Sequence, residues 1–178
     1  MTGVGSLSAF SDFLIGDEGF SLEEVVVRML TEKGTTLATA ESCTGGLIAS
    51  RVTDVSGASA VFTHGFVTYS NEAKHQLIGV QEETLRRHGA VSEEVAREMA
   101  LGAQRVSGAN FAISVTGIAG PTGGTEEKPV GTVCFGIATP TGVETFLECH
   151  PRSRADFKQQ SSHRALDLVR RAVRDLNS

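Results

Sequence analysis

The stretch Thr36-Leu-Ala-Thr-Ala-Glu-Ser-Cys-Thr-Gly-Gly46 constrains the fold more than any other part of the chain. It begins with the apolar run of a buried strand, turns through small residues, and leads into a helical pattern that starts at Leu47. A strand that runs into a helix through such a turn places Ser42 at the carboxyl edge of a sheet, where ligands bind in open α/β folds. We therefore expect Ser42 to lie in a ligand site.

The residues of this turn leave two interpretations open. Gly45 and Gly46 carry no Cβ, so a ligand can approach their N–H groups closely, and the N-terminus of the following helix favours a negative group. Alternatively, the turn only caps the helix, because Ser and Thr are preferred N-cap residues. The stretch is neither a Walker A loop nor a Gly-x-Ser-x-Gly elbow, so the rest of the chain has to decide.

Hydrophobic periodicity and capping signals predict an alternation of helices and strands. A hairpin beside strand–helix units implies a mixed sheet, and helices on both faces imply a single-domain, three-layer α/β/α sandwich. The expected strands are Thr35–Ala40, Ala60–Tyr69, Phe111–Val115, and a hairpin of Val130–Ala138 and Val143–Cys149 with a four-residue turn at Thr139–Gly142. The expected helices are Leu22–Lys33, one from Leu47 to near Asp54, Ser70–Gly79, Glu82–His88, one from Ser92 to Ser107, and Ser153–Leu176.

Length and composition limit the class of protein. A chain of 178 residues suits one domain. We expect residues 1–20 to form an arm that is flexible or docks on a neighbouring subunit, and residues 21–178 to form the domain. The net charge of −5 argues against a nucleic-acid partner, and three cysteines without disulfide or zinc spacing suit a reducing cytoplasm. We read no signal peptide and no membrane span, and therefore expect no membrane partner.

Three segments carry unusual residue types at predicted strand ends: the turn at Ser42, the segment from Tyr69 to Lys74, and the loop from Thr116 to Thr125. If their strands are neighbours that run in the same direction, the three loops meet at one sheet edge. A serine nucleophile needs a base, and no histidine lies in a turn like that of Ser42. Lys74 can serve if desolvation lowers its pKa, with the Tyr69 hydroxyl relaying a proton or holding the amine. Otherwise Lys74 is a solvated lysine and Tyr69 a half-buried tyrosine.

The third segment is rich in glycine. Gly117 and Gly120 expose backbone N–H groups as in an anion nest, with Thr116 at its entrance, and a phosphate or ribose would fit there. A flexible crossing loop is the other interpretation. Arg152 and Arg154 precede the last helix, and either can clamp a phosphate or lie on the surface.

Five motifs follow one another along the chain: Ala40-Glu-Ser-Cys-Thr-Gly-Gly46, Gly65-Phe-Val-Thr-Tyr-Ser-Asn-Glu-Ala-Lys74, Gly89-Ala-Val-Ser92, Ser114-Val-Thr-Gly-Ile-Ala-Gly-Pro121 and Lys128-Pro-Val-Gly-Thr132. In this order they resemble the CinA C-terminal domain family from about Leu22 to the C-terminus. That resemblance implies a nicotinamide mononucleotide deamidase, which hydrolyses the carboxamide to nicotinate mononucleotide and ammonia in pyridine nucleotide salvage, without a metal or other cofactor. It also implies a homodimer.

The resemblance assigns the nucleophile to Ser42, the base to Lys74 and an assisting role to Tyr69. It places nucleotide contacts at Thr116, at the turn from Gly117 to Gly120, and at Arg154. The residues themselves fit an acyl-enzyme amidase, with oxyanion donors among the amides of Cys43, Thr44, Gly45 and Gly46. Two alternatives stay open: a non-catalytic nucleotide-binding regulatory module linked to competence or damage, and an amidase for a related nucleotide amide.

Overall fold

The computed structural model describes residues 19–176, so residues 1–18 of the predicted arm lie outside the described part of the chain. Its helices are α1 (Leu22–Lys33), α2 (Leu47–Thr53), α3 (Asn71–Ile78), α4 (Glu82–His88), α5 (Glu93–Ser107) and α6 (Arg154–Asp175). Its strands are β1 (Leu37–Glu41), β2 (Phe62–Val67), β3 (Phe111–Gly117), β4 (Thr132–Thr139) and β5 (Gly142–Cys149), and a 3-10 helix, η3 (Ala58–Ala60), precedes β2.

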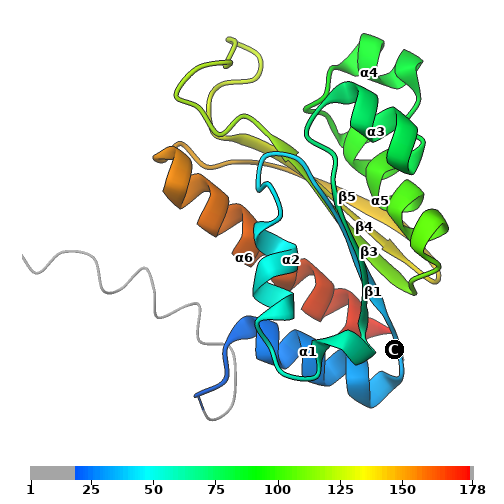
Figure 1. Cartoon of the computed structure of the whole chain (residues 1–178). Coiled ribbons are helices and arrows are strands. Elements are labelled where there is room, and N and C mark those ends of the chain that lie inside the picture. Colours follow the sequence, from blue (N-terminus) through cyan, green and yellow to red (C-terminus); the bar gives the residue numbers. More distant parts are fainter. Residues whose placement is uncertain (1–18, 177–178) are drawn as a thin grey trace, which may run out of the picture.

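The strands form one mixed sheet in the order β2-β1-β3-β4-β5. The first three are parallel, whereas β4 is antiparallel to β3 and β5 is antiparallel to β4. Figure 1 shows α1, α2 and α6 on one face of the sheet and α3, α4 and α5 on the other. The predicted α/β sandwich with a mixed sheet is therefore confirmed. In residues 19–176, no helix combines the length and apolar character needed to cross a bilayer.

The boundaries of the helices follow from local signals. Ser21 and Glu24 form a capping box at the start of α1, and Gly34 ends that helix in the left-handed conformation. The predicted bounds of α1 and α4 are confirmed, and the other helices agree to within about a residue at each end. In the β4–β5 hairpin, Thr139 pairs with Gly142, so only Pro140 and Thr141 form the loop of the predicted turn.

The two faces of the sheet differ in side-chain size. Large side chains such as Leu37 and Phe111 face α1, α2 and α6, whereas alanines on β1, β3 and β4 face α5. Ser114 Oγ donates to the Ala96 carbonyl oxygen of α5 at 2.6 Å, and a Cβ added to Gly136 would lie 2.4 Å from that oxygen. The small residues thus let α5 lie close against the centre of the sheet.

The topology brings three loops together at one sheet edge. Glu41 at the end of β1 is in register with Val67 of β2 and Val115 of β3. Because the strands are parallel, the segments that follow them leave at the same edge. The expectation that the loops after Ser42, Tyr69 and Thr116 meet is confirmed.

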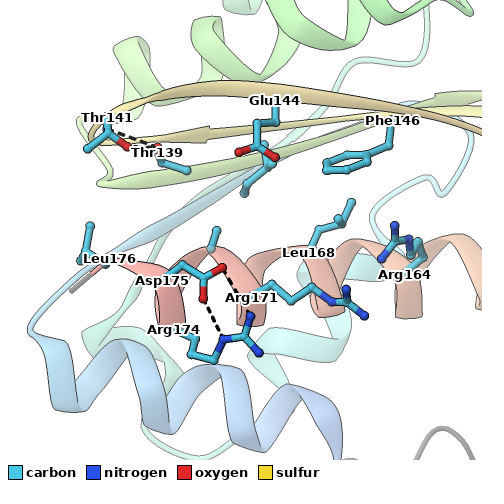
Figure 2. Close-up of a pocket in the computed structure, with 12 residues that line it drawn as sticks. Thr139, Thr141, Glu144, Phe146, Arg164, Leu168, Arg171, Arg174, Asp175 and Leu176 are labelled. Atoms are coloured by element: carbon cyan, nitrogen blue, oxygen red, sulfur yellow. Dashed lines mark hydrogen bonds and ion pairs between the residues drawn. The ribbon is translucent and has the colours of Figure 1, made fainter. Parts of the chain in front are cut away.

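A groove at the opposite sheet edge has a different character. It lies between β5 and the C-terminal part of α6 (Figure 2), and its basic side chains have acidic partners within the chain. Arg174 pairs with Asp175, and Arg171 pairs with Asp167. The groove therefore offers no unpaired basic side chain to an anionic ligand, and Ser42 is not part of its lining.

The close approach of α5 predicts that Gly136→Ala destabilises the fold by about 1 to 3 kcal/mol, since the added methyl overlaps the backbone of α5. Gly142→Ala is the matched control on β5, because a Cβ there meets nothing within 4 Å, and its effect should stay within about 0.5 kcal/mol. Urea unfolding of both variants measures the difference. Equal stabilities would show that α5 can move away at no cost.

Candidate active site

The turn after β1 fixes Ser42 at the sheet edge. The N–H of Ser42 donates to the carbonyl of Val115 at 2.9 Å, and the N–H of Gly45 donates to the carbonyl of Ser42 at 3.1 Å. Gly45 and Gly46 have φ angles of 63° and 95°, a region that residues with side chains rarely adopt. Glycine is therefore required here to close the turn, in addition to leaving space.

The carboxylate of Glu41 occupies the N-terminus of α2. It accepts hydrogen bonds from the N–H groups of Gly46 at 3.0 Å, Ile48 at 3.0 Å and Ala49 at 2.8 Å. The anion at this helix end is thus a side chain of the protein itself, in place of the ligand group that the sequence-based interpretation puts there. The N–H groups of Gly45 and Gly46 are already used within the chain.

Lys74 is buried beside Ser42. Its side chain is only 1% exposed, and Nζ lies 3.1 Å from Ser42 Oγ. The amine also donates to the carbonyl oxygens of Thr68 at 2.8 Å and Tyr69 at 3.4 Å. Helix α3 holds it in place, since the hydroxyl of Ser70 caps that helix through the N–H of Ala73. The serine and the lysine are within direct hydrogen-bond reach.

Burial lowers the pKa of Lys74, because desolvation disfavours the ammonium form. A neutral amine has two N–H donors and one lone pair. The carbonyls of Thr68 and Tyr69 accept from the two donors, which leaves the lone pair for the Ser42 hydroxyl. This arrangement lets Lys74 act as the base that a serine nucleophile requires.

Cys43 is the other nucleophilic side chain at the site, and it is buried. Burial raises the pKa of its thiol to about 12, and the nearby charge of Glu41 acts in the same direction. The N–H groups of Cys43 and Thr44 act in the opposite direction, by favouring the thiolate. Cys43 therefore stays a neutral thiol near pH 7 and does not compete with Ser42 for attack.

Tyr69 contributes differently from the sequence-based interpretation. Its side chain is 60% exposed, and its hydroxyl accepts a hydrogen bond from Arg154 Nη2 at 3.0 Å. Arg154 Nη1 donates to the Gly120 carbonyl at 3.0 Å. The Lys74 amine contacts the carbonyl of Tyr69 and not its phenol. Tyr69 and Arg154 thus form a polar pair at the edge of the site.

A pocket of about 210 Å³ collects residues from all three predicted segments. No histidine of the described chain lines it. Of the predicted site residues, Thr44, Gly45, Gly46 and Gly120 are not among its lining, and Arg152 is exposed elsewhere. The lining residues are Ser42, Cys43, Tyr69, Lys74, Ala90, Val91, Thr116, Gly117, Ala119 and Arg154.

Two walls of this pocket, Ala90 and Val91, were not predicted from the sequence. They belong to the loop between α4 and α5, which is held over the site by two hydrogen bonds. Thr116 Oγ1 donates to the Ala90 carbonyl at 2.8 Å, and Lys128 Nζ donates to the Val91 carbonyl at 2.7 Å. Small apolar residues in a loop carry no chemical signal, although Gly89–Ser92 forms one of the motifs. Within residues 19–176, no group of three or more His, Cys, Asp or Glu side chains could hold a metal ion.

The fold and the Ser42–Lys74 pair define a class: an α/β domain with a buried serine–lysine site at the carboxyl edge of its sheet. The family model for the CinA C-terminal domain matches residues 19–173, so the chain belongs to the CinA C-terminal domain family.

Relatives with names and structures agree with this family. "Nicotinamide-nucleotide amidohydrolase PncC" of Escherichia coli K12 is 54% identical over 85% of this chain and 93% of its own length. A "CinA-like protein" of Chloroherpeton thalassium is 52% identical over 89% of this chain and 39% of its own length. This chain spans about two fifths of several curated relatives. The structure of the competence/damage inducible protein CihA from Agrobacterium tumefaciens is 42% identical, covering 90% of this chain and 100% of that one, with a TM-score of 0.81.

The lowered pKa of Lys74 predicts a pH-dependent stability. Below its folded pKa, the buried ammonium costs folding free energy. As pH rises from that value to the ordinary 10.5, the unfolded chain binds a proton that the folded chain does not, so the cost is relieved. The free energy of unfolding of the wild type, minus that of Lys74→Met, should increase over this window. Urea titrations from neutral to alkaline pH measure it, and a constant difference would contradict a depressed pKa.

Proposed function

We propose that this chain is an amidohydrolase that converts nicotinamide mononucleotide to nicotinate mononucleotide and ammonia, in pyridine nucleotide salvage. The observation that carries the proposal is the Lys74 amine, buried within 3.1 Å of the Ser42 hydroxyl and lining a pocket with it. The name of the Escherichia coli relative, which matches over almost its whole length, supports the substrate.

In the first step, the oxygen of Ser42 attacks the carboxamide carbon while Lys74 takes the hydroxyl proton. The charge that develops on the amide oxygen needs hydrogen-bond donors. In the described part of the chain, the N–H groups of Cys43 and Thr44 donate to no backbone oxygen. They are therefore the donors that we assign to the oxyanion, in place of Gly45 and Gly46.

The C–N bond then breaks, and protonated Lys74 returns the proton to the leaving ammonia. This leaves an acyl-enzyme on Ser42. A water molecule replaces ammonia and loses a proton to Lys74 as it attacks the ester. Collapse of the second tetrahedral intermediate releases the product acid, which loses its proton to solvent, and Lys74 returns its proton to the oxygen of Ser42.

The size of the pocket indicates how the nucleotide lies. A volume of about 210 Å³ is below the roughly 300–1,000 Å³ of pockets that bury drug-sized ligands. We therefore place the pyridine ring and carboxamide inside, with the ribose and phosphate directed toward Thr116, Gly117 and Arg154. Arg154 is the phosphate contact in this arrangement, because its Nη2 donates to the hydroxyl of the exposed Tyr69 at the edge of the site, where a phosphate can reach it. The homodimer stays a prediction, which the mass of the protein in solution tests.

Ser42→Ala and Lys74→Met should each lower kcat for ammonia release from nicotinamide mononucleotide by a factor of at least about 10³, since the nucleophile and its base act as a unit. A coupled ammonia assay at neutral pH measures this, with circular dichroism to check folding. Substrate binding without turnover by the wild type would favour a regulatory module instead. Turnover of a different pyridine amide in a substrate panel would change the substrate but keep the reaction.

Arg154 and Arg152 form a matched pair for the phosphate site. Arg154→Ala should raise KM for nicotinamide mononucleotide about 10-fold or more, because a charge-assisted contact to the phosphate is lost. Arg152→Ala should leave KM within about twofold, since its side chain lies outside the pocket. The riboside, which lacks the phosphate, should show no difference between wild type and Arg154→Ala. Equal effects of both substitutions would argue for general charge attraction only.

A further inference from the structure

One buried acidic side chain lies next to the nucleophile and takes no part in the chemistry of Ser42 and Lys74. Glu41 is 1% exposed, and its carboxylate accepts three hydrogen bonds from the backbone of the turn and the first residues of α2. Its own carbonyl accepts from the N–H of Thr68 at 2.8 Å. Thr68 in turn supplies the carbonyl that holds Lys74. Glu41 therefore connects the nucleophile turn, helix α2 and the support of the base.

We propose that Glu41 is a positioning residue for the amidase reaction. Its carboxylate holds the turn from Ser42 to Gly46 closed, and thereby sets the Ser42 hydroxyl against Lys74 and the N–H groups of Cys43 and Thr44 toward the substrate. The inference rests on the proposed function for the identity of the reaction. The positioning of the Ser42 hydroxyl by Glu41 does not depend on which substrate is hydrolysed.

The composition of the turn makes such a support necessary. Gly45 and Gly46 have no side chains that could pack and hold the turn in place, and glycine backbones are the most free to rearrange. Helix α2 spans only seven residues, and its N-cap Gly46 makes no side-chain hydrogen bond. The carboxylate from the preceding strand supplies the missing cap. Without it, the N–H groups of Gly46, Ile48 and Ala49 lose their acceptor.

The charge of Glu41 also suits the site. The carboxylate lies at the N-terminus of α2, where the helix carries a partial positive charge, and it already occupies the position that an anionic ligand would take. Phosphate binding at this helix end is therefore disfavoured, which leaves the substrate phosphate to the side of Arg154. The same charge acts with burial to keep Cys43 protonated, and so prevents a thiolate from pairing with Lys74.

Glu24, which caps helix α1 away from the site, provides a control for the substitution of Glu41. Glu24 of α1 accepts a hydrogen bond from the N–H of Ser21 at 2.7 Å, on the surface of the molecule. Glu24→Gln and Glu41→Gln make the same chemical change at two helix starts. If Glu41 only stabilises its helix, both variants should lose thermal stability and keep their activity at temperatures well below Tm.

The test measures kcat and KM for nicotinamide mononucleotide, together with the rate at which phenylmethylsulfonyl fluoride labels Ser42. In that labelling, the serine oxygen bonds to sulfur and fluoride leaves, so it reports on the nucleophile without the substrate. For Glu41→Gln we expect kcat and the labelling rate to fall about 10- to 100-fold, because a small misplacement of reacting groups costs that much, with KM within about threefold. Glu24→Gln should match the wild type in all three.

Glu41→Asp keeps the negative charge on a side chain that is one methylene shorter. Its kcat should therefore lie between those of the wild type and Glu41→Gln. It also carries the test if Glu41→Gln fails to fold. Wild-type kcat and labelling in either folded Glu41 variant would overturn the positioning role. If phenylmethylsulfonyl fluoride labels Ser42 of the wild type but the protein releases no ammonia from any amide, the proposed function is wrong. The labelling rates of the variants then still test the positioning role of Glu41. Absence of both overturns both proposals.

Discussion

The proposed active site depends on one interaction, the contact between the buried amine of Lys74 and the hydroxyl of Ser42. Water would keep the amine charged, and a charged amine cannot take a proton. The fold excludes water by burying the side chain of Lys74, a residue of α3, with the carbonyls of Thr68 and Tyr69 as its other partners. Within residues 19–176, no carboxylate accepts a hydrogen bond from this amine, so desolvation lowers its pKa without a counter-charge at hydrogen-bond distance.

The sheet provides the rigid frame for that contact. The strands β1, β2 and β3 are parallel, so the segments that follow them lie at one edge of the sheet. These segments are the turn at Ser42, the segment from Tyr69 to Lys74 and the glycine-rich loop after Thr116. On the face toward α5, small residues such as Ala40 and Gly136 allow the helix to lie close to the sheet. The loop that precedes α5 then lies over the pocket, and its residues Ala90 and Val91 form part of the pocket wall. The packing of α5 against the sheet thus shapes one wall of the pocket.

Negative charge is distributed so that it does not disturb the base. Glu41 faces the N-terminus of α2, where three backbone N–H groups receive it. Arg154 is directed to the pocket mouth through Tyr69 and Gly120. The lowered pKa of Lys74 favours the neutral amine inside the site, while Arg154, the proposed phosphate contact, lies at its edge.

The sequence by itself determined the order of the elements, because periodicity and caps such as Ser21 and Gly34 are local properties. It also placed Ser42 at a sheet edge and Lys74 near Tyr69, since these depend on short separations. The tertiary structure decided that Tyr69 offers its carbonyl to Lys74, that its phenol meets Arg154, and that Glu41 takes the helix end expected for a ligand. The contact of Tyr69 with Arg154 joins segments that are 85 residues apart and depends on how the strands are ordered. The other two pairings are short in sequence, but they depend on side-chain rotamers and on the closed turn, which hydrophobic periodicity and capping signals do not encode.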